Sequence, residues 1–375
     1  MHHPSTFIGI LATLLISNIQ AMSSSSPILS SRALTQGPQP TQDPFLFCVY
    51  HKDHYPAATD ETMELPQRGN GHDFDPTAPY RMYHGDKIAG FPQHPHRGFE
   101  TITATIEGIV DHADSLGNAG RYGEGDVQWM TSGKGVVHGE MFPLVHTDRP
   151  NHTRFFQIWL NLPSKNKMVD PSFAMFWAND VPKYVSGDEK ASVTVWFGDY
   201  FGSKNKNKCP PDSWAGDPAN DVAVLHITLQ PGGRLVVPKA KASKCNRSLY
   251  LVEGSNLGVN VAGTVLKDRV GRVLEVDSSV DLELSLPENV SSSDSDVVEF
   301  LLLQGKPIEE PVAQHGPFVM NTQQEIMMAF MDYQKTQFGG WPWERDDMVF
   351  PQNKGRFALL NGKETTPGGS ATCNK

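Results

Sequence analysis

The chain has 375 residues, of which 38% are hydrophobic and 20% are charged, and its formal net charge is −10 at pH 7. This length is sufficient for two domains of common size, each with its own core. The 42 acidic residues outnumber the 32 basic ones, and the lysines gather only in a short run at residues 204–208. Direct binding to nucleic-acid phosphates is therefore disfavoured.

Cysteine usage is sparse. The chain contains Cys48, Cys209, Cys245 and Cys373, which are scattered and form no CxxC pair. This pattern indicates neither a zinc knuckle nor a dense disulfide framework. One disulfide stays open as an alternative if the protein is exported.

The first 42 residues predict a targeting segment outside the fold. Residues 7–16 form an apolar run of the length of a signal-peptide core, too short to span a bilayer comfortably, and Ala21 stands at a plausible cleavage point. Residues 22–42 are rich in serine and lack acidic residues, like an organelle transit peptide. We expect the secretory route or a plastid. If Met22 is the true start, the signal disappears and the cytoplasm is the alternative.

From residue 43 the chain has the pattern of an antiparallel all-β structure. The apolar run at residues 44–50 predicts a strand, and polar loops follow as far as residue 92. In residues 99–106 (FETITATI), β-branched side chains alternate between two faces, as in a strand. Glycine-containing turns separate further short strands, expected at residues 126–130, 154–162 and 191–197. Many short strands with little helical periodicity indicate a barrel or sandwich.

A second series of strands has the same texture and suggests a duplicated fold. These strands are expected at residues 222–229, 248–253, 258–261, 272–276 and 297–303. Residues 323–335 predict a helix that begins after Asn321 or Thr322 as its N-cap. We therefore divide the chain into a targeting segment, a first domain, a second domain, and a strap with helix and polar tail, at residues 1–42, 43–188, 189–310 and 311–375.

Two short motifs carry the chemistry. Alternate residues of a strand face the same way, so His94 and His96 can aim at one point, as can His138 and Glu140. Two such pairs meeting inside a barrel would make a site of three imidazoles and one carboxylate. This donor set suits Fe(II), Mn, Co, Ni or Cu better than Ca or Mg. Four protein ligands on a six-coordinate ion leave two positions open, as in a catalytic site.

The other histidines are expected to have no part in this site. His51 and His54 have an HxxH spacing without a partner carboxylate pattern, and we expect both in a solvent-exposed loop. Four further histidines are single, namely His112, His146, His152 and His315. Between residues 222 and 305 the only histidine is His226, so the second domain is expected to be a metal-free support or interaction surface.

Three ordered stretches resemble the pirin family of bicupin metalloproteins: HPHRGFET, YGEGDVQWMTSGKGVVHGEM and QHGPFVMNT, at residues 94–101, 122–141 and 314–322. The resemblance covers roughly residues 43–358 and implies two cupin-type antiparallel β-barrels with a short C-terminal helix. It implies that residues 314–322 form a strap against the first barrel. It also implies an iron site, in which Glu100 has only a supporting role and the ligands are His94, His96, His138 and Glu140.

One departure from the family concerns the strand that begins DPFL. The family commonly carries an acidic residue where this chain has Val49 or Tyr50, and this strand is expected to shape the mouth of the metal pocket. The polarity of the pocket and its substrate are therefore open, whereas the metal ligands are unaffected.

The resemblance implies a dioxygenase of the quercetin 2,3-dioxygenase type. It would use Fe(II) or another divalent transition metal to bring dioxygen to a flavonol-like enolic aromatic, with Glu140 as ligand and candidate base. The alternative is a non-catalytic, redox-sensing iron protein that regulates a protein partner as a transcription cofactor. A third reading is a metal-binding or storage protein without turnover. We expect no direct nucleic-acid binding, no membrane span and, by analogy, a monomer.

Overall fold

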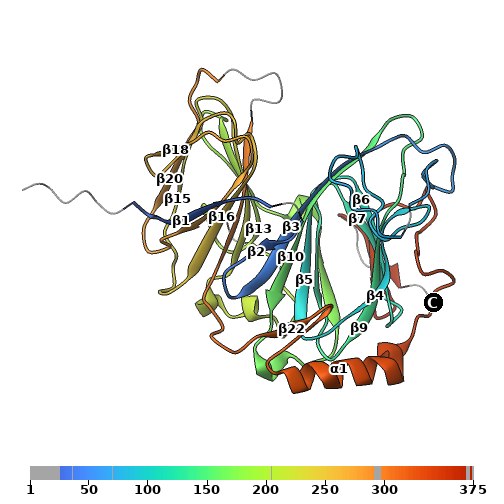
Figure 1. Ribbon diagram of the computed structural model, residues 1–375. Coiled ribbons are helices and arrows are strands. Elements are labelled where there is room, and N and C mark those ends of the chain that lie inside the picture. Colours follow the sequence, from blue (N-terminus) through green and yellow to red (C-terminus); the bar gives the residue numbers. More distant parts are fainter. Residues whose placement is uncertain are drawn as a thin grey trace, which may run out of the picture.

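The computed structural model describes residues 26–35, 37–69, 71–203, 205–290, 297–368 and 372–373. This part of the chain consists of β-sheets and one α-helix, α1 (Gln323–Thr336), and its sheets form two units side by side (Figure 1). The expected signal core at residues 7–16, Ala21 and Met22 lie outside the described residues. Within the described ranges, no helix has the length and apolar character needed to cross a membrane.

The first unit consists of two sheets. In spatial order one contains β11 (Ser172–Phe176), β8 (Val127–Thr131), β5 (Phe99–Glu107), β10 (Asn151–Asn161), β3 (Phe45–Tyr55) and β2 (Gln39–Pro40). The other contains β26 (Thr372–Cys373), β25 (Lys363–Thr365), β24 (Phe357–Leu360), β7 (Ala119–Gly123), β6 (Ile109–Asp114), β9 (Val136–Phe142) and β4 (Ala89–His96). Buried side chains from both sheets meet in one cluster, so the sheets face each other.

The second unit also has two sheets. The larger contains β1 (Ile28–Ala33), β19 (Arg272–Val276), β16 (Asn246–Glu253), β21 (Val298–Gly305), β14 (Ala223–Leu229), β13 (Ala191–Phe197) and β12 (Lys183–Val185). The smaller contains β15 (Arg234–Val237), β20 (Leu282–Ser285), β17 (Val259–Val261) and β18 (Thr264–Leu266). The sheets of this unit therefore begin at β12, before the expected boundary at residue 189, and include a strand from the N-terminal segment.

Short 3-10 turns connect several strands. They span Ser164–Asn166, Ala178–Asp180, Trp214–Gly216, Pro218–Asn220 and Gln337–Gly339. The turns at Trp214–Gly216 and Pro218–Asn220 lie in the long loop before β14, and each begins with a side chain that accepts a backbone hydrogen bond: Ser213 accepts from Ala215 and Asp217 from Ala219. These caps order part of a loop that the sequence marks only as long and polar.

The N-terminal segment belongs to the fold from residue 26, which corrects the expectation that residues 1–42 lie outside it. β1 pairs antiparallel with β19 of the second unit, and β2 pairs with β3 of the first. Both are edge strands, which are held mainly by backbone hydrogen bonds, so a serine-rich composition does not prevent their pairing. The segment from β1 to β2 therefore ties the two units together.

The two units share an apolar interface between the six-stranded sheet of the first unit and the larger sheet of the second. On β10, Phe156, Ile158 and Leu160 lie in this interface. Gln157 and Trp159 point the other way, into the first unit, where they contact Glu140 and His96. The period of two along a strand explains this division, because successive side chains leave opposite faces of the sheet. β10 thus serves the interface and the interior of the first unit at once.

The C-terminal strap, a hairpin of β22 (Ala313–His315) and β23 (Phe318–Met320) followed by α1, packs against the first unit (Figure 1). As predicted, Thr322 caps α1: its hydroxyl accepts a hydrogen bond from the Glu325 amide at 3.2 Å. Buried Lys167 fastens the strap, because its ammonium group donates to the carbonyls of Gly98 at 2.8 Å and Val319 at 3.2 Å. The segment 314–322 therefore lies against the first unit, as the resemblance implies.

Candidate metal centre

Three histidines converge inside the first unit. One ring nitrogen from each of His94, His96 and His138 lies within 4.8 Å of the others. His94 and His96 are two residues apart on β4, and His94 lies opposite His138 in the pairing of β4 with β9. The register of this pairing shifts between Phe91 and His94, an irregularity of the kind that re-aims side chains near functional sites. The Nε2 atoms of His94 and His96 are 3.1 Å apart.

The three imidazoles are available as neutral donors. Burial lowers the pKa of all three rings, so protons do not compete for their lone pairs near pH 7. His94 Nδ1 donates to the carbonyl of Pro92 at 2.9 Å, which leaves the lone pair on Nε2. Both buried ring nitrogens of His138 lack a hydrogen-bond partner among the described residues. A metal ion would satisfy such a nitrogen, so the donor set fits a divalent transition metal.

Glu140 is oriented by three neighbouring side chains. It follows His138 by two residues on β9 but is not a member of the group of three. Its Oε1 accepts from the hydroxyls of Thr103 at 2.8 Å and Tyr122 at 3.2 Å, and its Oε2 accepts from Gln157 Nε2 at 2.6 Å. Its role as fourth ligand stays a prediction. Nothing in the sequence marks its three partners, because they come from three other strands.

His112, which we expected to be single, lies beside the group. It is fully buried on β6, opposite Glu140 in the pairing with β9, and its ring centroid is 5.5 Å from that of His138. Its Nε2 lies 3.6 Å from a carboxylate oxygen of Asp114. Residues 109–114 (IVDHAD) show no regular alternation of apolar and polar side chains, and the strand pairing that brings His112 to His138 leaves no mark in the sequence.

The expectation that His51 and His54 lie in an exposed loop is wrong, because both residues lie in a strand and only His54 is exposed. Both residues belong to β3, where His54 is exposed but His51 is only 6% exposed and Asp53 is fully buried. His51 Nδ1 lies 2.8 Å from the hydroxyl of Tyr83, which donates to Asp53 at 2.8 Å. The polar residues 51–54 resemble a loop in the sequence. Their partners Arg81 and Tyr83 lie about thirty residues further along the chain, so no local pattern shows that the segment is buried.

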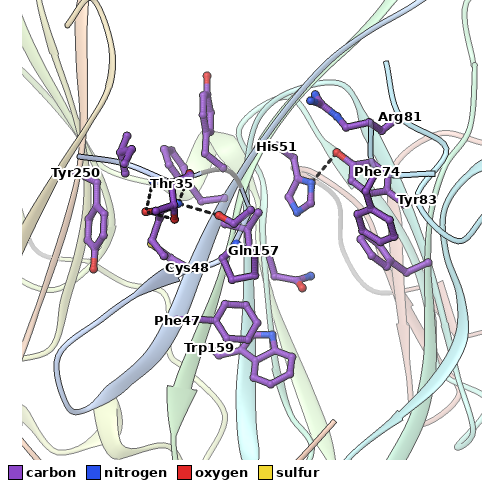
Figure 2. A pocket seen from close by; sticks show the side chains of 18 of the residues that line it. Thr35, Phe47, Cys48, His51, Phe74, Arg81, Tyr83, Gln157, Trp159 and Tyr250 are labelled. Carbon is purple, nitrogen blue, oxygen red and sulfur yellow. Dashed lines mark hydrogen bonds between the residues drawn. The ribbon is translucent and has the colours of Figure 1, made fainter. Parts of the chain in front are cut away.

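A cavity of about 650 Å³ adjoins the histidines, and Figure 2 shows many of the side chains that line it. This volume falls in the range of small-molecule sites. His94 and His96 line the cavity together with many aromatic side chains, including Phe47, Tyr50, Phe91, Trp159 and Tyr250. Val49 and Tyr50 also line it, as expected for the strand that begins DPFL.

The cavity reaches from the first unit to the boundary between the units. Its lining includes Gln157 on the inner face of the first unit and Tyr250 of the second. Thr35 and Gln39 of the N-terminal segment line it as well. Ligand access and shape therefore depend on both units and on the segment between β1 and β2.

Trp159 and Phe47 form one wall of the cavity, and Phe99, which is not part of the lining, stacks on Trp159. The ring of Trp159 lies 3.9 Å from that of Phe99 and 4.2 Å from that of Phe47, measured between centroids. The same indole contacts His96 at 5.2 Å with an interplanar angle of 75°. A flat aromatic ligand against this wall would lie next to the histidine group.

Comparison with known proteins agrees with the fold and the motifs. The family models Pirin and Pirin C-terminal cupin domain match residues 30–160 and 224–339. A pirin-like protein of Solanum lycopersicum is 37% identical over 248 residues, which are 66% of this chain and 76% of that protein. Homo sapiens pirin is 33% identical over 269 residues, 71% and 83% of the two chains.

A solved structure extends this comparison to the fold. The 1.88 Å crystal structure of a quercetin 2,3-dioxygenase from Acinetobacter baumannii has a TM-score of 0.64 and 25% identity to this chain. The match covers 84% of this chain and 99% of that one. Both units of the fold are thus shared, and the fold is a bicupin with a short C-terminal helix. The chain belongs to the pirin family.

Proposed function

We propose that this protein is a metal-dependent oxygenase of the quercetin 2,3-dioxygenase type, acting on flavonol-like enolic aromatics. The observation that supports it is a group of three neutral histidines at an aromatic-lined cavity of about 650 Å³. The likeness to a structure named as a quercetin 2,3-dioxygenase adds support. Fe(II) is the metal we propose, and other divalent transition metals suit the same donors.

The chain's own residues would divide the work. His94, His96, His138 and Glu140 would hold the metal, which when bound would supply a Lewis acid and a centre for dioxygen chemistry. The stacked wall at Trp159 would hold a flat substrate beside His96. Gln157 lines the cavity and donates to Glu140, so it connects the substrate space with the candidate base.

The test is metal content and oxygen uptake with quercetin on the full chain, compared with His138→Ala. We expect near-stoichiometric iron and oxygen uptake in the wild type, and loss of both in the variant. His54→Ala is the matched control, because His54 is an exposed histidine on β3. Iron bound without oxygen uptake would contradict the enzyme proposal, and absence of metal from the wild type would contradict the site.

A non-catalytic regulator is the second candidate, and the surface of α1 favours it. Met327, Met328 and Met331 are 54–67% exposed on this helix, and flexible methionines suit an adaptable protein interface. Arg97, adjacent to His96, donates to Asp332 of α1 at 2.8 Å, which connects the helix to the histidine motif. Partner capture that depends on the metal's oxidation state, without oxygen uptake, would favour this function.

A further inference from the structure

His51 is a buried polar group in the cavity that the proposed chemistry does not use. Figure 2 shows it among the residues that line the cavity. His94 lines the same cavity, and the exposed fraction of His51 is 6%. Its ring stacks on Phe155 with centroids 4.4 Å apart and an interplanar angle of 17°. The edge of Tyr83 meets it at 5.1 Å. Packing therefore holds the imidazole in one orientation.

Hydrogen bonds decide which nitrogen of His51 carries the proton. The carboxylate of Asp53 accepts from the backbone amide and Nε of Arg81, each at 2.9 Å, and from the Tyr83 hydroxyl at 2.8 Å. Since the Tyr83 proton points to Asp53, the Tyr83 oxygen accepts from His51 Nδ1–H. His51 Nε2 therefore carries a lone pair, and it makes no hydrogen bond to any residue that the structure describes.

The charge state of His51 indicates that it accepts hydrogen bonds and does not act as a catalytic base. Burial, followed by the nearby charge of Arg81, lowers the pKa of His51 to about 3. The ring is neutral at physiological pH and does not keep a proton taken from a hydroxyl group. Its Nε2 is instead a permanent acceptor at the edge of an apolar cavity.

We propose that His51 Nε2 is a ligand-recognition point that accepts a hydrogen bond from a ring hydroxyl of an aromatic ligand. Phe91 contacts the rings of both His51 and His94, at centroid distances of 6.0 and 6.3 Å, so the acceptor and the histidine group border the same space. A multi-ring polyphenol can reach both. The inference rests on the proposed function for this ligand class, and the acceptor geometry stands independently of turnover.

A hydroxyl donor fits this point better than an anion. Arg81 also lines the cavity, but its guanidinium is already bound to Asp53 and to the carbonyl of Lys52. The positive charge nearest to His51 is thus balanced by a carboxylate. A bare imidazole nitrogen repels an anionic oxygen and attracts an O–H group.

The experiment measures equilibrium binding of two probes to the full chain without oxygen: quercetin, and flavone, which has the same ring system without hydroxyl groups. For His51→Leu we expect quercetin to bind about three- to tenfold more weakly, the loss of one hydrogen bond, and flavone to bind as in the wild type. His51→Gln retains an acceptor and should recover most of the affinity. Metal content should equal that of the wild type in both variants.

Two further variants separate recognition from structure. Tyr83→Phe leaves the His51 ring in place but removes the acceptor for Nδ1–H, so quercetin affinity should fall by less than in His51→Leu. His54→Leu on the same strand should change neither probe. Equal weakening of quercetin and flavone in His51→Leu, unchanged quercetin affinity, or a wild type that binds neither probe would each overturn the inference.

The outcome is separable from that of the proposed function. If the wild type takes up no oxygen but His51→Leu loses the preference for quercetin over flavone, the enzyme proposal is overturned and the recognition point is supported. A wild type that turns over quercetin, with the same KM in His51→Leu, would overturn the recognition point alone.

Discussion

The two units of the bicupin have the same sheet architecture but different interiors. In the second unit, buried aliphatic side chains such as Val193, Leu225 and Leu302 form one large cluster between the sheets. In the first unit, histidines, carboxylates and a cavity share the corresponding space with a hydrophobic cluster. The difference teaches that the fold supplies two enclosed spaces, and the inward residues of a few strands decide which becomes a binding site.

Strand β14 shows that a shift of one residue along a strand determines whether a polar side chain points into a unit or away from it. Its residues Leu225, Ile227 and Leu229 point into the core of the second unit. His226, one position out of phase, lies on the opposite face, near Phe156 of the first unit, and its Nε2 lies 2.8 Å from Glu299 of the neighbouring strand β21. On β9 the histidine and the glutamate occupy the inward phase instead. The phase of polar residues relative to the pleat therefore distinguishes the two units.

The largest effect is expected for the buried ion pair of the first unit. Arg121 donates to both oxygens of Asp111 at 2.7 Å, and both residues are nearly inaccessible to solvent. Arg121→Met leaves the carboxylate buried without its partner, which should lower the free energy of unfolding by about 3–5 kcal/mol. Urea denaturation measures it. A loss below about 1 kcal/mol would mean that the stability of the first unit does not depend on this pair.

In the aliphatic core of the second unit, a substitution should affect stability through apolar packing alone. Leu225→Ala removes a fully buried side chain and should lower the free energy of unfolding by about 2–5 kcal/mol through lost burial and a cavity. Because the change lies in the second unit, the metal content of the folded protein should equal that of the wild type. Loss of metal at low denaturant would show that the units are not separable in this sense.

Glu100 of the first unit should make the free energy of unfolding depend on pH. Burial raises its pKa to about 7 from a usual 4.5, although hydrogen bonds from Ser213 and Thr131 oppose this. Between these pH values the folded protein binds more protons than the unfolded chain, so stability falls as pH rises from 4.5 to 7. Glu100→Gln should remove this fall and add on the order of 2 kcal/mol at pH 8. Thermal unfolding across this pH range measures it, and parallel curves for the two proteins would contradict it.

The smallest effect is expected at the surface. Lys134, next to the second histidine motif, forms an ion pair with Asp170, and both side chains are more than half exposed. Lys134→Ala should change the free energy of unfolding by less than about 1 kcal/mol, because solvent screens the pair. Metal content should not change. A clear loss of metal would mean that Lys134 acts on the histidine group.

Local rules predicted part of this site, and tertiary pairing supplied the rest. The convergence of His94, His96 and His138 follows from a period of two in two strands, which the sequence displays directly. The partners of Glu140 and of His51 come from distant strands and a loop, so no local pattern reveals them. The place of β1 escaped for another reason: an edge strand needs backbone hydrogen bonds more than an apolar side-chain pattern.

The segment from β1 to β2 couples ligand binding to the association of the units. It is attached to both units by strand pairing, and residues between its strands line the cavity. A ligand that contacts Thr35 or Gln39 therefore favours the attached state of the segment. By thermodynamic reciprocity, detachment of the segment weakens ligand binding by the same factor. Cleavage near residues 34–39 would therefore weaken ligand binding while leaving His94, His96 and His138 in place.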